Sequence, residues 1–327
     1  MADPLVVLPR PGASSSETPH IIPAPSESAF VAAFGQILPQ ASFLKTRNGN
    51  IAFYELSPSS IVPGQTPSPI SRVLFVHGIQ TCAIGLQPLA STLSTRFPGA
   101  KCVLVDLWGH GLTDTPFVAH DAALAHDLLE SVMAHIGWED AHFVGFSLGG
   151  SMTASFAAAR PERVASLTLI APAGFVRQSQ FNETQKGYLR GGEAIEEQAK
   201  AWILEFLEGG DLVVPSDWKE RVERGEVVAE AVRQWQMKHH QGHVASVVAM
   251  FRDAGVLDRD EEFAKVAKTG IKSLCILGQL DDIVSEQDLH SIGMQNTVLV
   301  PQAGHAVVRE KVPEVAGLIE DFWKKLG

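Results

Sequence analysis

The sequence predicts an α/β protein with a mostly parallel, doubly wound sheet and a helical cap inserted within it. Over most of the 327 residues, short continuous apolar runs alternate with segments of helical periodicity, as in parallel strands that are buried on both faces. Between residues 175 and 262 this alternation stops, and no strong strand pattern occurs. A hairpin signal precedes the first apolar run, so we expect an antiparallel hairpin that leads into the parallel sheet.

Composition narrows the class of protein. The chain is long enough for one large domain or a domain with an insertion, and its 45% apolar content fits a substantial core. A net charge of −11 disfavours nucleic acid or an anionic membrane surface as a partner, because both attract basic residues. No apolar run approaches the ~20 residues of a membrane span, and no signal peptide pattern is recognisable. We expect a cytoplasmic protein, and a homodimer stays open.

Three cysteines, Cys82, Cys102 and Cys275, are too few and too scattered for a disulfide framework. Residues 1–40 form a Pro/Ser-rich extension, whose prolines leave no room for a regular element before about Ser26. A short helix is expected at residues 30–38. The rest of the chain divides into a core at residues 41–174 and 263–327 and a helical cap at residues 175–262.

Within the core, strands at residues 43–45 and 51–56 are joined by Arg47-Asn48-Gly49-Asn50, a hairpin-turn signal. A Pro/Ser-rich loop at residues 57–71 follows. The expected parallel strands are residues 73–77, 102–107, 142–146, 164–170, 274–277 and 297–300. The expected helices between them are residues 86–96, 120–136, 148–160 and 311–325.

Helical spacing in the cap is clear at residues 193–207, 222–235 and 244–251. An insertion after the strand at residues 164–170 would cover the carboxyl ends of the strands, where open α/β sheets bind their ligands. We therefore interpret the cap as a lid. The alternative is a helical bulge that contributes only to stability.

The most informative motif is Gly145-Phe146-Ser147-Leu148-Gly149. It lies between an apolar strand and a helix, the context of a nucleophile elbow, in which a strained turn exposes the serine hydroxyl. Small residues two positions before and after the serine let the turn close. Ser147 is therefore the candidate nucleophile.

A serine nucleophile needs a base, and His305 is the candidate. It lies between the last expected strand and the last helix, at the same sheet edge as Ser147. His239, His240 and His243 could suggest a metal site, but no Cys or Glu partner of known spacing lies nearby. We expect these three side chains to be solvated or to line a pocket, and we expect no metal.

The base in turn needs an orienting carboxylate. Asp281 follows the strand at residues 274–277 by a short turn and is favoured over the adjacent Asp282, which can begin the next turn. The other strand end that could supply an acid reads Ala171-Pro172-Ala173-Gly174 and has none. The oxyanion donors would be the backbone N–H groups of Leu148 and of Ile79, with Gln80 as the reserve.

This set of residues resembles the α/β-hydrolase superfamily over roughly residues 43–326. The chain order Ser147, Asp281, His305 is that of the family, and His77-Gly78, the segment from Asp106 to Gly111, and Gly304-His305 lie where its motifs lie. The helical cap looks like that of capped esterases, lactonases and carbon–carbon hydrolases. Ring-cleavage hydrolases typically carry Trp after the catalytic His, whereas this chain has Ala306. Serine at the elbow, rather than Asp, argues against dehalogenases and epoxide hydrolases.

The resemblance and the motifs together predict a serine hydrolase that cleaves a carboxylic ester or lactone without a cofactor. Thioester or carbon–carbon hydrolysis, a lyase step, and a small-molecule receptor that retains the triad stay open. Aromatic residues predict an apolar or aromatic small-molecule substrate, although each cap tryptophan can instead belong to the core of the cap. The candidate pocket residues are Gln80, Phe146, Phe175, Trp202, Phe206, Trp218 and Trp235.

Overall fold

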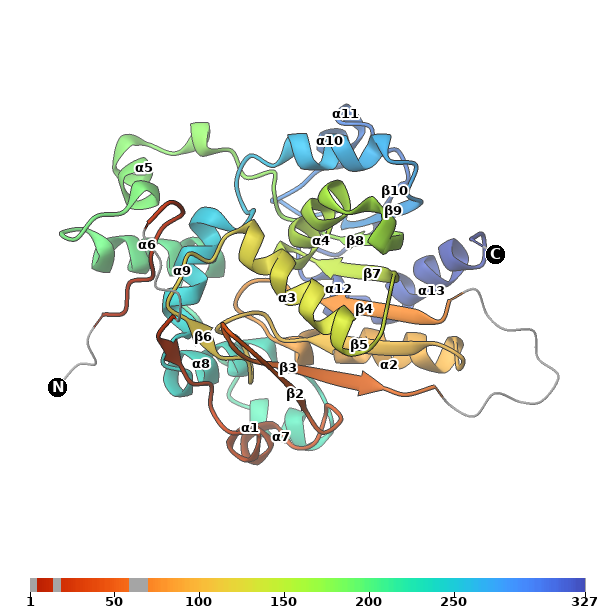
Figure 1. Ribbon diagram of the computed structural model, residues 1–327, viewed down its shortest axis with the longest axis horizontal. Helices are drawn as coiled ribbons and strands as arrows, with labels where there is room; N and C mark the ends of the chain where they lie inside the picture. The colour runs from red at the N-terminus through yellow and green to blue at the C-terminus, as the bar shows by residue number, and fades with distance from the viewer. Residues whose placement is uncertain (1–4, 14–18, 59–69, 327) are drawn as a thin grey trace.

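The computed structural model describes residues 5–13, 19–58 and 70–326. Most of the loop predicted at residues 57–71 and parts of the predicted extension lie outside these residues. The main strands are β2 (Ser42–Thr46), β3 (Gly49–Leu56), β4 (Arg72–Val76), β5 (Lys101–Val105), β7 (Ala141–Phe146), β8 (Val164–Ile170), β9 (Ser273–Gly278) and β10 (Thr297–Val300). They form one sheet in the order β10-β9-β8-β7-β4-β5-β3-β2 (Figure 1).

The sheet is parallel from β10 to β5, and β3 runs antiparallel to both of its neighbours. The predicted class, a mostly parallel α/β sheet entered through a hairpin, is therefore confirmed. The predicted strands agree with the observed ones to within about two residues at most ends. This agreement arises because a strand that is buried on both faces needs apolar residues at successive positions, and such a run is easy to recognise in the sequence.

Helices cover both faces of the sheet. They are α2 (Gln87–Arg96), α3 (Ala122–His135), α4 (Leu148–Ala159), α10 (Asp260–Lys268) and α13 (Val312–Trp323). α4 packs against α3 and α10, and α2 packs against α13. Successive residues of β4 point to opposite faces: Leu74 and Val76 join the cluster under α3 and α4, whereas Val73 and Phe75 join the cluster under α2 and α13.

The helical insertion contains α5 (Glu183–Arg190), α6 (Glu196–Glu208), α7 (Trp218–Glu223), α8 (Ala229–His239) and α9 (His243–Asp253). Val176 and Leu257 form a parallel bridge where it leaves and re-enters the core. In Figure 1, α5, α6, α8 and α9 lie together at the end of the molecule away from α13. The single helix predicted at residues 222–235 is wrong. Gly225, at φ +82°, follows the end of α7 and separates it from α8.

The described part of the N-terminal extension contains regular structure that its prolines did not predict. β1 (Ile21–Ile22) pairs antiparallel with β6 (Thr115–Pro116), so the expectation of no regular element before Ser26 is wrong. A two-residue pairing fits between neighbouring prolines because it needs few backbone donors. α1 (Glu27–Phe34) begins earlier than predicted, because the Ser26 hydroxyl accepts the N–H of Ala29 and caps it.

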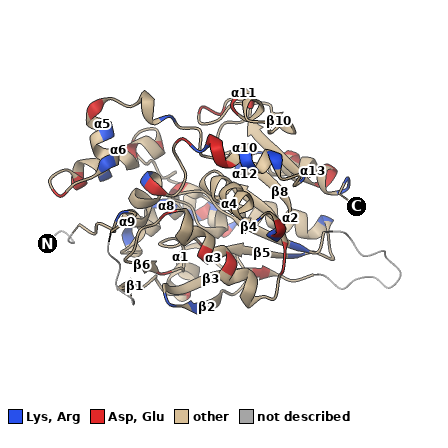
Figure 2. Cartoon of the chain, turned by 45° about the horizontal axis from the view of Figure 1, so that its top comes forward, with Lys and Arg blue, Asp and Glu red and all other residues tan. Residues whose placement is uncertain are grey.

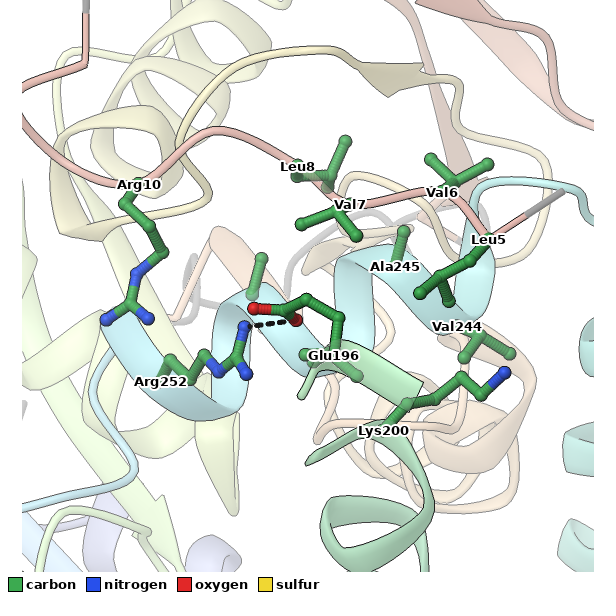
Figure 3. A pocket seen from close by; sticks show the side chains of 12 residues that line it. Leu5, Val6, Val7, Leu8, Arg10, Glu196, Lys200, Val244, Ala245 and Arg252 are labelled. Atoms are coloured by element: carbon green, nitrogen blue, oxygen red, sulfur yellow. Dashed lines mark hydrogen bonds and ion pairs between the residues drawn. The ribbon is translucent and has the colours of Figure 1, made fainter. Parts of the chain in front are cut away.

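Residues 5–13, which we call the N-terminal strap, lie across the helical insertion. Leu8 is buried against Ala245 and Ala249 of α9. Figure 3 shows Leu5 to Leu8 running past Ala245 of α9 and, nearby, the ion pair between Arg252 of α9 and Glu196 of α6. The charged atoms of that ion pair are 2.9 Å apart. The strap thus joins the surface formed by two helices of the insertion.

Charged residues give the fold no strongly basic face in the view of Figure 2, where acidic and basic residues are mixed along the helices. Among the residues that the structure describes, no helix combines the length and apolar character needed to cross a membrane.

Candidate active site

Ser147 occupies the turn between β7 and α4 with φ 52° and ψ −119°, a conformation that costs energy for a residue other than glycine. The turn can close because glycines flank it. A Cβ on Gly145 would lie 2.4 Å from the Thr153 hydroxyl, and a Cβ on Gly149 would lie 2.1 Å from the carbonyl oxygen of Val76. The predicted strand–serine–helix context is present, and the side chain of Ser147 points into a pocket.

The structure brings the three predicted triad residues together. Ser147 Oγ lies 2.9 Å from Nε2 of His305, and Nδ1 of His305 lies 3.0 Å from the nearer carboxylate oxygen of Asp281. Ser147 is 8% exposed, and the Asp281 side chain is fully buried. A carboxylate in this position fixes the orientation of the imidazole, and the imidazole can take a proton from the hydroxyl.

The turns after β9 and β10 are hydrogen-bonded to each other, and this holds Asp281 against His305. The N–H of Leu280 donates to the carbonyl of Ala303 at 2.8 Å, and a Cβ on Gly278 would lie 2.2 Å from the carbonyl oxygen of Gly304. The turn after β9 also holds the acid itself, because the N–H of Ile283 donates to Asp281 at 2.8 Å. Asp282 makes no such contact with His305 and lines a different surface hollow.

The two predicted oxyanion donors line the same pocket as Ser147. The N–H groups of Leu148 and Ile79 make no hydrogen bond to any residue that the structure describes. The reserve candidate is committed elsewhere, because the N–H of Gln80 donates to Nε2 of His110 at 3.3 Å. The geometry therefore favours Ile79 over Gln80 as the second donor.

The pocket has a volume of about 110 Å³. Of the side chains predicted to line it, Gln80, Phe146 and Phe206 do so. Thr81, Val176, Leu207 and Ile283 also line it and were not predicted. These four residues come from the loop after β4, the start of the helical insertion, α6, and the turn after β9.

The other four predicted pocket residues lie elsewhere. Phe175 packs against Phe263 of α10, and Trp202 packs among Phe181, Phe206 and Phe251. Trp218 and Trp235 pack against α1, with their rings 6.1 Å and 5.9 Å from the ring of Phe34. Their helical spacing reflects burial against neighbouring helices, and periodicity cannot distinguish such burial from a position at a pocket.

Two functional candidates escaped the sequence analysis entirely: Arg233 of α8 and Arg309 of α12 (Val307–Glu310) both line the pocket. For Arg309 a signal was present, because it follows His305 by only four residues and lies in the short segment that leads away from it. Arg233 arrives through the tertiary packing of the insertion, and no local pattern indicates it.

The histidines near the insertion do not form a metal site. Within the described part of the chain, no group of three or more His, Cys, Asp or Glu side chains could hold a metal ion. His239 is exposed, and its ring stacks on Trp235. His240 and His243 are buried, which contradicts the expectation that they are solvated or line a pocket. Burial lowers the pKa of His243 to about 3, so it is a neutral structural group.

Comparisons with known proteins agree with the fold. Residues 71–311 match the family described as alpha/beta hydrolase fold. A putative 2-succinyl-6-hydroxy-2,4-cyclohexadiene-1-carboxylate synthase from Bacillus subtilis is 20% identical over 80% of this chain and 93% of its own length. The crystal structure of naproxen esterase from Bacillus subtilis superposes with a TM-score of 0.57 at 17% identity, covering 90% of this chain and 94% of that one.

A further relative shares a shorter region. The dihydrolipoyllysine-residue acetyltransferase component of the acetoin cleaving system of Cupriavidus necator is 34% identical over 107 residues. That match covers 32% of this chain and only 27% of the relative, so it spans about a quarter of the relative's length. Because the family match spans most of the chain, this protein belongs to the α/β-hydrolase family.

Proposed function

We propose that this protein is a serine hydrolase that cleaves a carboxylic ester, open-chain or cyclic, through an acyl-enzyme. One observation carries the proposal: Ser147 Oγ lies 2.9 Å from His305 Nε2, while Asp281 is in contact with the other ring nitrogen. An unassisted serine hydroxyl is a poor nucleophile at neutral pH, and this arrangement provides the base that it needs.

In the first half-reaction, Ser147 Oγ forms a bond to the carbonyl carbon of the ester and its proton passes to Nε2 of His305. The N–H groups of Leu148 and Ile79 stabilise the oxyanion. As the tetrahedral intermediate collapses, the bond to the leaving alkoxide breaks and His305 returns the proton to it. Water then attacks the acyl-enzyme with His305 as base, and the acid product leaves.

A lyase or carbon–carbon bond reaction with the same residues is the second candidate. It is favoured by the Bacillus subtilis relative, which is matched over nearly all of its length and is named a synthase. Ala306, rather than Trp, follows His305 and counts against the carbon–carbon hydrolases that act on ring-cleavage products. A panel of esters, lactones, thioesters and carbon–carbon substrates distinguishes these chemistries by kcat/KM.

The test of the proposal is labelling with a fluorophosphonate, read by intact mass. We expect one adduct on the wild-type protein, none on Ser147→Ala, and one on the control Ser94→Ala, which removes a hydroxyl from α2 outside the pocket. The adduct depends on an activated serine hydroxyl. Its absence from folded wild-type protein, or its persistence in Ser147→Ala, would contradict the assignment. Ester turnover should be lost in the same variant.

A further inference from the structure

The pocket at Ser147 is charged in an unexpected way. Arg233 and Arg309 both line it, and no Asp or Glu is among its described lining residues. This is notable in a chain whose net charge is −11. The rest of the wall is mostly apolar, with Phe146, Leu207 and Ile283 among its members. The pocket therefore combines an apolar surface with two guanidinium groups.

Arg309 is the unusual one of the pair. Among the described residues its side chain has no ion pair within 4.0 Å and no hydrogen bond, and its Nη1 atom is buried without a partner. Its guanidinium carbon lies 5.4 Å from the centre of the Phe146 ring. A ring face can attract a cation, but it does not satisfy all five N–H donors of a guanidinium.

No carboxylate pairs directly with Arg309 among the described residues. Burial and, to a smaller extent, the nearby Arg233 lower its pKa to about 10, against opposing contributions from Glu230 and Glu310, so it stays protonated at neutral pH. Glu208 and Glu230 are each 3.3 Å from Arg233 rather than from Arg309. Glu208 also accepts a hydrogen bond from the side chain of Gln80 at 2.9 Å. These two carboxylates are thus committed to other partners.

A partly buried guanidinium without an ion pair is costly, and it is usually retained where an anion completes it. We propose that the substrate carries a carboxylate that pairs with Arg309 while its ester carbonyl lies at Ser147, so that the substrate is a short ester with an apolar body and an anionic end. This inference rests on the proposed function, and it replaces the purely apolar substrate expected from the aromatic residues. A half-ester of a short dicarboxylic acid, such as the five-carbon glutaric acid, belongs to this class.

The experiment compares two p-nitrophenyl esters of equal chain length, the hemiglutarate and the valerate, which differ only in the terminal carboxylate. We expect the wild-type kcat/KM to be at least about tenfold higher for the hemiglutarate. In Arg309→Met this ratio should fall by about tenfold or more, whereas Arg309→Lys should retain part of it because the charge remains. The control Arg224→Met removes an exposed, equally charged arginine outside the pocket and should leave the ratio unchanged.

Using a ratio makes the result independent of losses in folding or in the triad, since both esters use the same Ser147. A wild-type ratio near one, or a ratio that is the same in wild type and Arg309→Met, would overturn the inference. If Arg309→Met fails to fold, the kcat/KM ratios of the wild type and of Arg309→Lys still test the inference.

Binding separates this inference from the proposed function. Glutarate should bind Ser147→Ala in calorimetry and bind more weakly, by about tenfold or more, when Arg309→Met is added. If the fluorophosphonate does not label the protein, the proposed function fails. Glutarate binding then still tests whether Arg309 binds a carboxylate. If labelling succeeds and glutarate does not bind at millimolar concentration, the anion site alone is wrong.

Discussion

The strained backbone of Ser147 is held in place by hydrogen bonds and close contacts with the neighbouring strands. Its N–H donates to the carbonyl of Ile170 at 3.0 Å, and its carbonyl accepts the N–H of Ala173 at 2.9 Å. The first turn of α4 then passes close to the end of β4, where Gly149 faces the Val76 carbonyl. Hydrogen bonds to the end of β8 on one side, and the close approach of Gly149 to the end of β4 on the other, thus fix the height of the hydroxyl above the sheet.

Gly149→Ala should disrupt this turn. The added Cβ would lie 2.1 Å from the Val76 carbonyl oxygen, so α4 must move away from β4, and we expect a loss of about 3 kcal/mol or more of unfolding free energy. Urea denaturation and the rate of fluorophosphonate labelling measure it. Gly99→Ala is the control, because nothing lies within 4 Å of its Cβ. Equal midpoints for the two variants would show that the turn tolerates the methyl group.

At the scale of single residues, the sequence predicts the site residues whose position is set by the end of a strand. Ser147, Asp281 and His305 could be identified because each follows the end of a strand, and parallel strands bring those ends to one edge. The two pocket arginines could not be assigned in this way. Whether Arg233 contacts solvent or substrate depends on how α8 packs on the core, and that packing leaves no periodic signal in the sequence.

The N-terminal strap shows how an element without regular structure can hold others in place. The guanidinium of Arg10 forms an ion pair with Asp253 at the end of α9, at 2.8 Å. It also donates to the carbonyls of Leu189 and Arg190 at the end of α5, at 2.8 and 3.1 Å. One side chain thus connects the ends of two helices of the insertion.

Removing that connection should loosen the helical insertion. We expect Arg10→Met to cost about 1–2 kcal/mol and to speed amide exchange in α5 and α9 relative to β7, because carbonyls at the end of α5 and a half-buried carboxylate lose their donor. Hydrogen exchange by mass spectrometry measures this. Arg72→Met serves as control, since it removes an exposed ion pair with Asp140 worth less than about 1 kcal/mol. Unchanged exchange in α5 and α9 would refute the role of the strap.

The predicted boundaries of helices were wrong where a single residue sets the end of the helix. The break between α7 and α8 depends on Gly225, which adopts φ +82°, whereas the apolar spacing alone continues through it. The start of α1 depends on the capping hydroxyl of Ser26. Apolar periodicity reports which side of a segment is buried, and caps and left-handed residues report where the segment stops.

For the molecule as a whole, buried imidazoles connect the insertion to the core. Nδ1 of His243 contacts the carbonyl of Gly109 at 2.9 Å, and Nε2 of His240 contacts the carbonyl of Thr113 at 3.0 Å. The ring of His110 lies 4.7 Å from that of His243 and 5.3 Å from that of His77. Charging the ring of His77, His110 or His243 would bury a cation without a carboxylate beside it, whereas Asp114 partly favours the charged form of His240.

Burial lowers the pKa of all of these histidines in the folded protein: to about 4 for His77, to about 3 for His243, and in the same direction for His110 and His240. Below about pH 6.5 the unfolded chain therefore binds protons that the folded chain does not. Each such histidine lowers the unfolding free energy by about 1.4 kcal/mol per pH unit as the pH falls. The Asp106 carboxyl, whose pKa burial raises to about 6, has the opposite sign and offsets about one of them.

The protein should consequently be stable above pH 6.5 and lose several kcal/mol of unfolding free energy between pH 6.5 and pH 5, long before carboxylate titration dominates. Urea denaturation at half-unit intervals of pH measures the slope. His243→Gln should reduce that slope by up to about 1.4 kcal/mol per pH unit, because it removes one histidine that binds a proton only in the unfolded chain. His239→Gln, which changes the exposed histidine stacked on Trp235, should leave it nearly unchanged. A stability that stays constant from pH 6.5 to 5 would mean that these rings are protonated in the folded state, and that the contact between insertion and core accommodates the charge.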